Sequence, residues 1–172
     1  MIKRIKVPEE RIAVLIGRNG KTRRYIQQKT HTKIKIVDDV EINGDSIDVM
    51  TAETIIRAVA RGFSPENAFS LLSEKNTLVI MDLPKNEREL KRIKSRLIGM
   101  GGKCRKNIEV LTRTKISIYG RTAGIIGSYE NTKLAGDAIR RLVTGISHKK
   151  VYEYLESHHN KFNGENDFTT AD

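Results

Sequence analysis

The sequence predicts an α+β protein built from two tandem copies of one small unit, and two observations lead to this class. When the 172-residue chain is compared with itself at an offset of 82, residues 15–36 align with residues 97–118, and 12 of the 22 aligned positions are identical. Each copy combines short β-branched runs with longer segments of helical apolar spacing. A repeat of this length that occurs twice indicates two domains, because stacked solenoids need three or more units. We expect domains at residues 1–75 and 76–157 and a mobile tail at 158–172.

The first copy carries local signals that place its elements in order. Pro8 suits the first turn of a helix, and Ile12 and Leu15 follow at helical spacing. Residues 32–37 alternate apolar and polar side chains, as a half-buried strand does. The predicted elements are a strand at 2–7, helices at 8–16 and 21–29, strands at 32–37 and 46–50, and a helical stretch at 52–73 divided at Gly62.

The second copy repeats this order with a longer first helix. Leu90, Ile93 and Leu97 give that helix its apolar stripe, and the basic residues within 91–96 surround the stripe. The predicted elements are a strand at 77–83, a helix at 84–98, a helix from 103, strands at 115–119 and 123–127, a helix at 131–142, and a further helix ending near 155. Because apolar residues after Gly145 repeat the pattern after Gly62, we expect an extra C-terminal helix in each unit.

Each copy also has a glycine loop between its first two helices. Gly17-Arg18-Asn19-Gly20-Lys21 in the first copy aligns with Gly99-Met100-Gly101-Gly102-Lys103 in the second. Glycines lack a Cβ atom, so a sugar-phosphate chain can approach the main chain closely. The helix that follows begins at a lysine and points its unpaired N–H groups and positive dipole end at phosphate. The loops therefore predict binding of a nucleic-acid backbone.

Basic side chains after the loop and the following strand complete the predicted site. We expect the apolar residues of that strand to help line a floor under the bases. The predicted RNA-binding residues are Gly17, Arg18, Asn19, Gly20, Lys21, Arg23 and Arg24 in the first copy, and Gly99, Met100, Gly101, Gly102, Lys103, Arg105, Lys106, Lys115, Ile116, Ser117 and Ile118 in the second.

The charge distribution favours the second copy as the stronger binder of a polyanion. The whole chain has a net charge of +11, of which residues 1–80 carry +4 and residues 81–156 carry +9. Lysines and arginines near phosphates release condensed counterions on binding. The basic residues 91–96 are expected to extend the contact to neighbouring phosphates. A role of the charge in solubility alone is the alternative interpretation.

These residues resemble the KH domain of the eukaryotic type, with the order β-α-α-β-β-α. The resemblance rests on the two Gly-x-x-Gly loops, each preceded by Ile and followed by Lys, and on the strand pattern Thr-Lys-Ile-x-Ile at residues 32–36 and 114–118. In that family the loop binds about four nucleotides of single strand. The resemblance covers nearly the whole chain twice. It implies single-stranded RNA binding without aromatic stacking platforms.

The tandem arrangement is similar to one group in particular, the archaeal relatives of the small-subunit ribosome assembly factor that partners the PIN-domain endonuclease at the 3′ end of small-subunit rRNA. That resemblance implies RNA binding near this rRNA end, mainly through the second domain. It implies two protein partners, the PIN-domain rRNA endonuclease and the alpha subunit of translation initiation factor 2. The first loop is degenerate in eukaryotic relatives, whereas Gly17-Arg18-Asn19-Gly20 is intact here. The intact loop leaves a direct role for the first domain in RNA binding.

Three functions are compatible with these observations. A non-catalytic RNA-binding assembly factor is favoured. A protein-interaction scaffold or translation-linked regulator with secondary RNA binding is the alternative. A nuclease or other RNA-processing enzyme is disfavoured, because no catalytic constellation stands out.

The remaining reactive residues suggest structural roles, and no cofactor is expected. The acids of the acidic segment at 38–48 (Asp38, Asp39, Glu41, Asp45 and Asp48) could be read as a Mg²⁺ site, but acids are common at strand ends and turns. Cys104, the single cysteine, lies early in a helix whose N-terminus could lower its pKa, yet no His or Asn partner is evident. The chain has no run of 18 apolar residues and no signal-peptide pattern at its start, so we expect a cytoplasmic protein with no membrane association.

Overall fold

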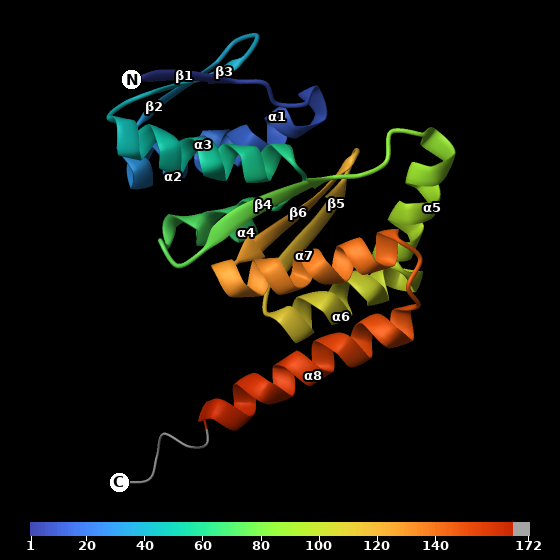
Figure 1. Ribbon diagram of the computed structural model, residues 1–172. Coiled ribbons are helices and arrows are strands. Elements are labelled where there is room, and N and C mark those ends of the chain that lie inside the picture. The colour runs from blue at the N-terminus through green and yellow to red at the C-terminus, as the bar shows by residue number, and fades with distance from the viewer. Residues whose placement is uncertain (167–172) are drawn as a thin grey trace, which may run out of the picture. The chain divides into compact units, whose positions relative to one another are not determined.

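The structure, a computed structural model, describes the backbone of residues 1–166 and the side chains of residues 1–159. The chain divides into two compact units, Met1–Leu78 and a second that begins at Val79. Each unit has a three-stranded sheet with helices packed on one face, as Figure 1 shows for each unit by itself. The predicted α+β class is confirmed.

The first unit follows the order strand, helix, helix, strand, strand, helix. Its elements are β1 (Ile2–Ile5), α1 (Glu9–Ile16), the 3₁₀ turn η1 (Arg18–Gly20), α2 (Lys21–Thr30), β2 (Lys33–Ile36), β3 (Val40–Asn43), α3 (Ser46–Ala60), the short α4 (Pro65–Phe69) and the 3₁₀ turn η2 (Ser70–Leu72). The strand order is β1-β3-β2, and both outer strands pair antiparallel with β3. The core of this unit lies between the sheet and its helices. It contains the fully buried side chains of Leu15 (α1), Ile26 (α2), Ile42 (β3) and Ile55 (α3).

The second unit repeats this arrangement with longer helices. Its elements are β4 (Thr77–Asp82), α5 (Glu87–Ile98), the 3₁₀ turn η3 (Met100–Gly102), α6 (Lys103–Thr112), β5 (Lys115–Tyr119), β6 (Thr122–Gly127), α7 (Tyr129–Val143) and α8 (His148–Asn166). The strand order is β4-β6-β5, with Ile116 of β5 opposite Ile125 of β6 in an antiparallel pair. The predicted stripe of α5 is confirmed, because Leu90, Ile93 and Leu97 are all buried in the core of this unit.

The prediction of a strand at residues 46–50 was wrong. The third strand is β3, where Val40 and Ile42 are fully buried on one face of the pleat. The helix α3 begins directly after it at Ser46. Within this window Ile47 is 80% exposed and Val49 is buried. These two apolar side chains therefore lie on opposite faces of the first turn of an amphipathic helix.

Two other predicted boundaries differ from the structure. Pro84 does not open α5. The helix begins at Glu87, because the side chain of Asn86 caps it by accepting a hydrogen bond from the Glu89 N–H at 3.1 Å. The predicted tail at 158–172 also begins too early, since α8 continues to Asn166. No proline occurs at 158–166 to end the helix where its apolar stripe stops. Residues 167–172 lie outside the described part of the chain.

An arginine brace recurs in both units and ties the helix before the glycine loop to the closing helix. Arg96 of α5 donates from Nε to the Leu142 carbonyl at 3.3 Å and from Nη2 to the Ile146 carbonyl at 2.7 Å. Arg11 of α1 makes the same two contacts at the end of α3, each at 2.8 Å. A guanidinium at these carbonyls satisfies groups that a helix C-terminus leaves unpaired. Arg96 is therefore committed to the fold, unlike the other basic residues of the segment 91–96.

Candidate nucleic-acid interface

The two glycine loops have the same backbone conformation. Gly17 and Gly99, which end α1 and α5, have φ/ψ of 74°/173° and 73°/176°. Asn19 and Gly101 both lie in the left-handed region, at 54°/30° and 62°/22°. The last glycine of each loop is also left-handed and immediately precedes α2 or α6. Two sequences that differ at the middle positions therefore build one loop geometry.

The first glycine of each loop serves packing rather than a close approach of ligand. A Cβ added at Gly17 would lie 2.2 Å from the Thr22 Oγ1 atom, and one at Gly99 would lie 2.8 Å from the Cys104 Cβ atom. The middle of the second loop is different, because a Cβ at Gly101 would have no atom within 4 Å. The room for a sugar-phosphate chain is therefore at the loop tip and not at the first glycine.

The loop tips and the following helix starts present exposed, mostly basic side chains. Neither α2 nor α6 has a side-chain cap at its N-terminus, so its first amide N–H groups point toward the loop without a capping oxygen. Such an N-terminus favours an anion. Met100 at the second tip is 93% exposed. The exposed predicted residues around the two loops are Arg18, Asn19, Lys21 and Arg24 in the first unit and Met100, Gly101, Lys103 and Lys106 in the second.

The predicted strand residues divide between surface and core. Lys115 is exposed at the start of β5, and Ser117 and Ile118 are partly exposed along it. Ile116 is 6% exposed and packs in the core, so its side chain cannot form a floor for bases. Of the predicted floor, Ile118 is the side chain that reaches the surface.

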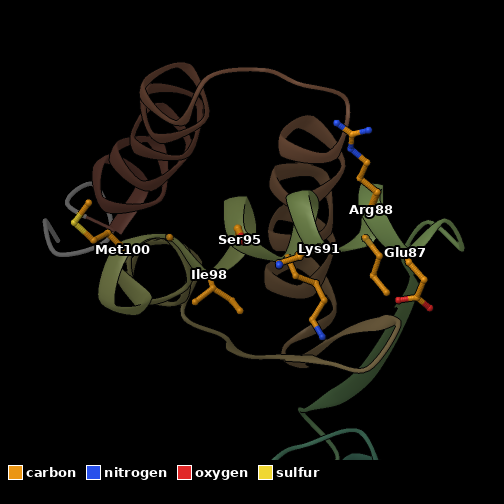
Figure 2. A pocket seen from close by; sticks show the side chains of 9 residues that line it. Glu87, Arg88, Lys91, Ser95, Ile98 and Met100 are labelled. Atoms are coloured by element: carbon orange, nitrogen blue, oxygen red, sulfur yellow. The ribbon is translucent and has the colours of Figure 1, made fainter.

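A groove of about 1020 Å³ runs along α5 and ends at the second loop. Figure 2 shows its lining side chains following this one helix from Glu87 and Arg88 to Met100. The lysines of this groove were predicted only as an extension of the site, and Arg88, Ser95 and Ile98 were not predicted as site residues. The residues 88, 91, 95 and 98 recur at intervals of three and four, which is the helical periodicity of a second face beside the buried stripe. That periodicity was the signal that could have identified the groove. The groove combines an apolar wall with basic side chains, as a site for a nucleic-acid strand requires.

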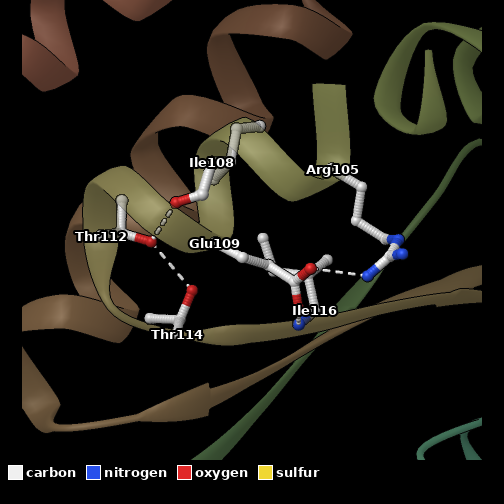
Figure 3. Close-up of polar contacts among 6 residues, drawn as sticks. All are labelled: Arg105, Ile108, Glu109, Thr112, Thr114 and Ile116. Atoms are coloured by element: carbon white, nitrogen blue, oxygen red, sulfur yellow. Dashed lines mark hydrogen bonds and ion pairs between the residues drawn. The ribbon is translucent and has the colours of Figure 1, made fainter. Parts of the chain in front are cut away.

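A network of hydrogen bonds fixes the helix after each loop to the edge strand of its sheet, and Figure 3 shows the network of the second unit. In the second unit, Glu109 Oε2 accepts from the Ile116 N–H at 3.0 Å, and Glu109 Oε1 is 2.6 Å from Arg105 Nη1. Thr112 donates to the Ile108 carbonyl at 2.6 Å and shares a 2.8 Å hydrogen bond with Thr114. Arg105, predicted to contact RNA, is thus held in an ion pair behind the loop.

The first unit builds the same network from its own residues. Thr30 bonds to the Ile26 carbonyl at 2.7 Å and to Thr32 at 2.8 Å. Gln27 Oε1 accepts from the Ile34 N–H at 2.8 Å. The threonines that the repeat alignment shares between the copies are therefore buried structural residues that position the strand beside the loop.

Cys104 lies buried beneath the second loop and is not an activated thiol. Burial raises the pKa of the Cys104 thiol, against the lowering effects of the hydrogen bond to Tyr152 and of Arg96. Burial also raises the pKa of Tyr152 to about 12, and its hydrogen bond to Cys104 adds to this increase. A neutral thiol and phenol packed together suit a structural role.

These two shifts predict loss of stability in alkali. Both groups hold their protons more tightly when folded, so the unfolding free energy is unaffected below the ordinary pKa of the thiol and falls as pH rises from there toward about 12. We expect Tyr152→Phe to show a shallower decline above about pH 10, in urea titrations across a pH series. Tyr129→Phe, at a tyrosine that is exposed, is the control and should decline like the wild type. An unchanged decline in Tyr152→Phe would contradict the assignment.

The other reactive residues do not form a metal site within the described residues, where no three His, Cys, Asp or Glu side chains gather. Part of the acidic segment contributes to a surface ion pair, because Glu41 lies 3.1 Å from Arg4. Among the described helices, none is long and apolar enough to cross a membrane.

Comparison with known sequences assigns both units. Residues 76–160 match the eukaryotic-type KH domain (KH-domain type I), and residues 2–58 match the KH domain. KH domain-containing protein MJ0443 of Methanocaldococcus jannaschii is 36% identical over 167 residues, which are 91% of this chain and 74% of that protein. RNA-binding protein pno1 of Drosophila pseudoobscura pseudoobscura is 31% identical over 66% of this chain and 50% of its own length. The chain thus spans about half the length of this insect relative.

Solved structures give the same relationship. The crystal structure of Dim2p from Pyrococcus horikoshii OT3 has a TM-score of 0.86 and 39% identity and covers 91% of this chain and 99% of that one. A chain in the a/eIF2alpha-aDim2p-rRNA complex from the same organism has a TM-score of 0.86 and 37% identity and covers 94% and 95%. The prediction of two tandem eukaryotic-type KH domains in a chain that resembles an archaeal group is confirmed, and the chain belongs to the KH-domain family, within the group of two-KH proteins that includes archaeal Dim2p.

Proposed function

We propose that this protein is a non-catalytic ribosome-biogenesis factor that binds single-stranded RNA near the 3′ end of small-subunit rRNA. The observation that carries the proposal is the recurrence of one loop geometry in both units. Each loop has an exposed tip, exposed basic side chains, and a helix N-terminus without a capping side chain. Backbone amides and basic residues arranged in this way bind phosphate irrespective of sequence.

The choice of RNA rests on the relatives. The complex that contains P. horikoshii aDim2p also contains rRNA, and a relative from Coccidioides immitis is a pre-rRNA-processing protein. The second unit is proposed as the main binder, because it has the higher net charge and the groove along α5. The predicted RNA-binding residues that face the loops and this groove are proposed as contacts, whereas Ile116 and Arg105 act through the fold.

Protein partners are a second component of this proposal. The aDim2p complex also contains a/eIF2alpha, which we propose as a partner here. The outer face of α3 supports a docking role for the first unit, since Ile47 is 80% exposed and Met50 is 61% exposed. Binding to the PIN-domain endonuclease stays a prediction from the sequence resemblance, and a cytoplasmic location stays a prediction from the composition.

The proposal predicts selective binding of single strands. Fluorescence anisotropy with a labelled RNA that matches the small-subunit rRNA 3′ end should give tight, salt-dependent binding. The same RNA annealed to its complement should bind much more weakly, because the loop and groove accept an unpaired strand. A scrambled strand of equal composition measures sequence preference.

The same samples distinguish the three functions. Equal binding of single strand and duplex would contradict the proposal and would indicate that a basic surface binds nucleic acid without regard to strandedness. Absence of RNA binding together with retained a/eIF2alpha binding would favour the scaffold. Cleavage of the labelled RNA by pure protein in Mg²⁺ would favour the enzyme, whereas we expect the RNA to remain intact.

A further inference from the structure

One position in the helix after the loop differs in charge between the two units while it keeps the same structural contact. Gln27 in α2 and Glu109 in α6 occupy equivalent places in the repeat. Each side-chain oxygen accepts a hydrogen bond from the edge strand, at 2.8 Å from the Ile34 N–H and 3.0 Å from the Ile116 N–H. The hydrogen bond to the strand does not require a charge, so the carboxylate of Glu109 must be explained by something else.

The carboxylate has a second partner in its own unit. Glu109 Oε1 is 2.6 Å from Arg105 Nη1, and the Glu109 side chain is 13% exposed (Figure 3). The Arg105 guanidinium lies directly behind the loop, because its Nη2 atom is 3.9 Å from where a Cβ on Gly102 would stand. A half-buried ion pair is screened far less than a surface pair. Glu109 therefore neutralises a cation that lies beside the last glycine of the second loop.

The equivalent cation in the first unit is not neutralised. Arg23 aligns with Arg105, and Gln27 offers it no charge. Its Nε atom is buried with no hydrogen-bond partner, and it has no ion pair among the residues whose side chains the structure describes. A buried N–H donor without an acceptor is destabilising and uncommon in folded proteins. Because this Nε atom is closed to solvent, a phosphate would have to pair with the terminal Nη atoms of the Arg23 guanidinium.

The difference extends to the whole loop-helix-strand segment. Residues 17–36 contain seven lysines and arginines and no acid, whereas residues 99–118 contain five and one acid, Glu109. The first unit has the lower total charge of the two, yet its loop segment is the more positive. Of these seven side chains, Arg18, Lys21 and Arg24 are exposed around the first loop.

We propose that the residue at this repeat position, Gln27 in the first unit and Glu109 in the second, sets the number of RNA phosphates that each KH unit neutralises. Gln27 leaves Arg23 as a cation that contacts a backbone phosphate of the bound RNA. Glu109 pairs with Arg105 and makes it a positioning residue, which orients the carboxylate that bonds α6 to β5. This inference rests on the proposed RNA-binding function and assigns different roles to two arginines that the repeat aligns.

Reciprocal charge swaps test the inference. For single strands, the slope of log Kobs against log[salt] changes by about 0.7 for each phosphate neutralised. We expect Gln27→Glu to make the slope shallower by about 0.7 and to weaken binding roughly fourfold at 0.15 M salt. We expect Glu109→Gln to free Arg105 and to steepen the slope by a similar amount. Each variant retains a side-chain oxygen for the strand amide, and thermal melts verify the fold.

Two further variants separate a local effect from a change in overall charge. Asp137→Asn removes a carboxylate from an ion pair with Arg140 on α7, 2.7 Å apart, so it changes the net charge as Glu109→Gln does. It should leave the slope at the wild-type value. Arg23→Met should itself lower the slope and should abolish the effect of Gln27→Glu in the double variant.

The outcomes separate this inference from the proposed function. The probe throughout is the single-stranded rRNA 3′-end RNA. If the wild type fails to bind it in a salt-dependent way, the proposed function fails. If the wild type binds and the two swaps keep its slope, or if Asp137→Asn shifts the slope as much as Glu109→Gln, the inference is overturned while the proposed function stands.

Discussion

Gly101→Asp should weaken binding of single-stranded RNA by about 10- to 100-fold, whereas Gly101→Asn should bind close to the wild type. The Gly101 position has no atom within 4 Å of an added Cβ, so both side chains fit without a clash. Its φ of 62° is tolerated best by Gly, Asn and Asp, and Asn19 adopts the same conformation in the first loop. The two variants differ by one charge at the loop tip. A carboxylate about 4 Å from a phosphate costs roughly 1 to 4 kcal/mol, depending on the local dielectric.

The first loop provides the matched comparison. Asn19→Asp places a carboxylate at the equivalent tip without changing its shape. Loss of affinity in Gly101→Asp alone would assign recognition to the second unit. Comparable losses in both variants would indicate that one RNA engages both loops. If Gly101→Asp and Gly101→Asn bound equally well in anisotropy titrations, phosphate would not lie at this tip.

Gly99→Ala should lower the free energy of unfolding by about 2 to 4 kcal/mol, because this glycine meets two separate constraints. Its φ/ψ of 73°/176° lies in a region that is essentially restricted to glycine and costs other residues roughly 1 to 3 kcal/mol. An added Cβ would also lie 2.8 Å from both the Cβ and the backbone nitrogen of Cys104. The backbone nitrogen cannot rotate away, so the start of α6 would have to move.

Gly101→Ala is the control for this effect. It has the strain of the left-handed region without a clash, so we expect a loss of about 1 kcal/mol. Urea titrations of the two variants measure the difference directly. Equal destabilisation would show that the close packing against Cys104 is not significant, and the first glycine would then be free to serve ligand approach.

The repeat in the sequence was sufficient to predict the order of elements and the place of both loops. Most of the residues that are identical between 15–36 and 97–118 have a local physical reason, either in the core, in the loop or in the threonine network that fixes the edge strand. The prediction at residues 46–50 failed because the strand leads into the turn at Asn43-Gly44-Asp45 instead of following it, and only the sheet pairing identifies β3 as the inner strand. Local propensity cannot supply that tertiary information.

The partners of the arginines could not be predicted from the sequence. Arg11 and Arg96 make equivalent contacts to the closing helices, yet they lie six and three residues before their loops, so the repeat alignment does not pair them. Arg23 and Arg105 do align, but one is in an ion pair and the other is not. A count of charges treats these four arginines alike. In the fold, Arg11 and Arg96 bond to backbone carbonyls and Arg105 pairs with Glu109, so these three are not equally available to bind RNA.

The most direct test of the central claim is an NMR titration of the uniformly ¹⁵N-labelled protein with the single-stranded rRNA 3′-end RNA. Binding at the loops predicts that the largest amide shifts occur at residues 99–103 and, in the first unit, at residues 17–21. Smaller shifts should follow the exposed face of α5. Shifts confined to α8, to the acidic segment at 38–48 or to the outer face of α3, with both loops unchanged, would contradict the claim that the glycine loops bind the RNA backbone.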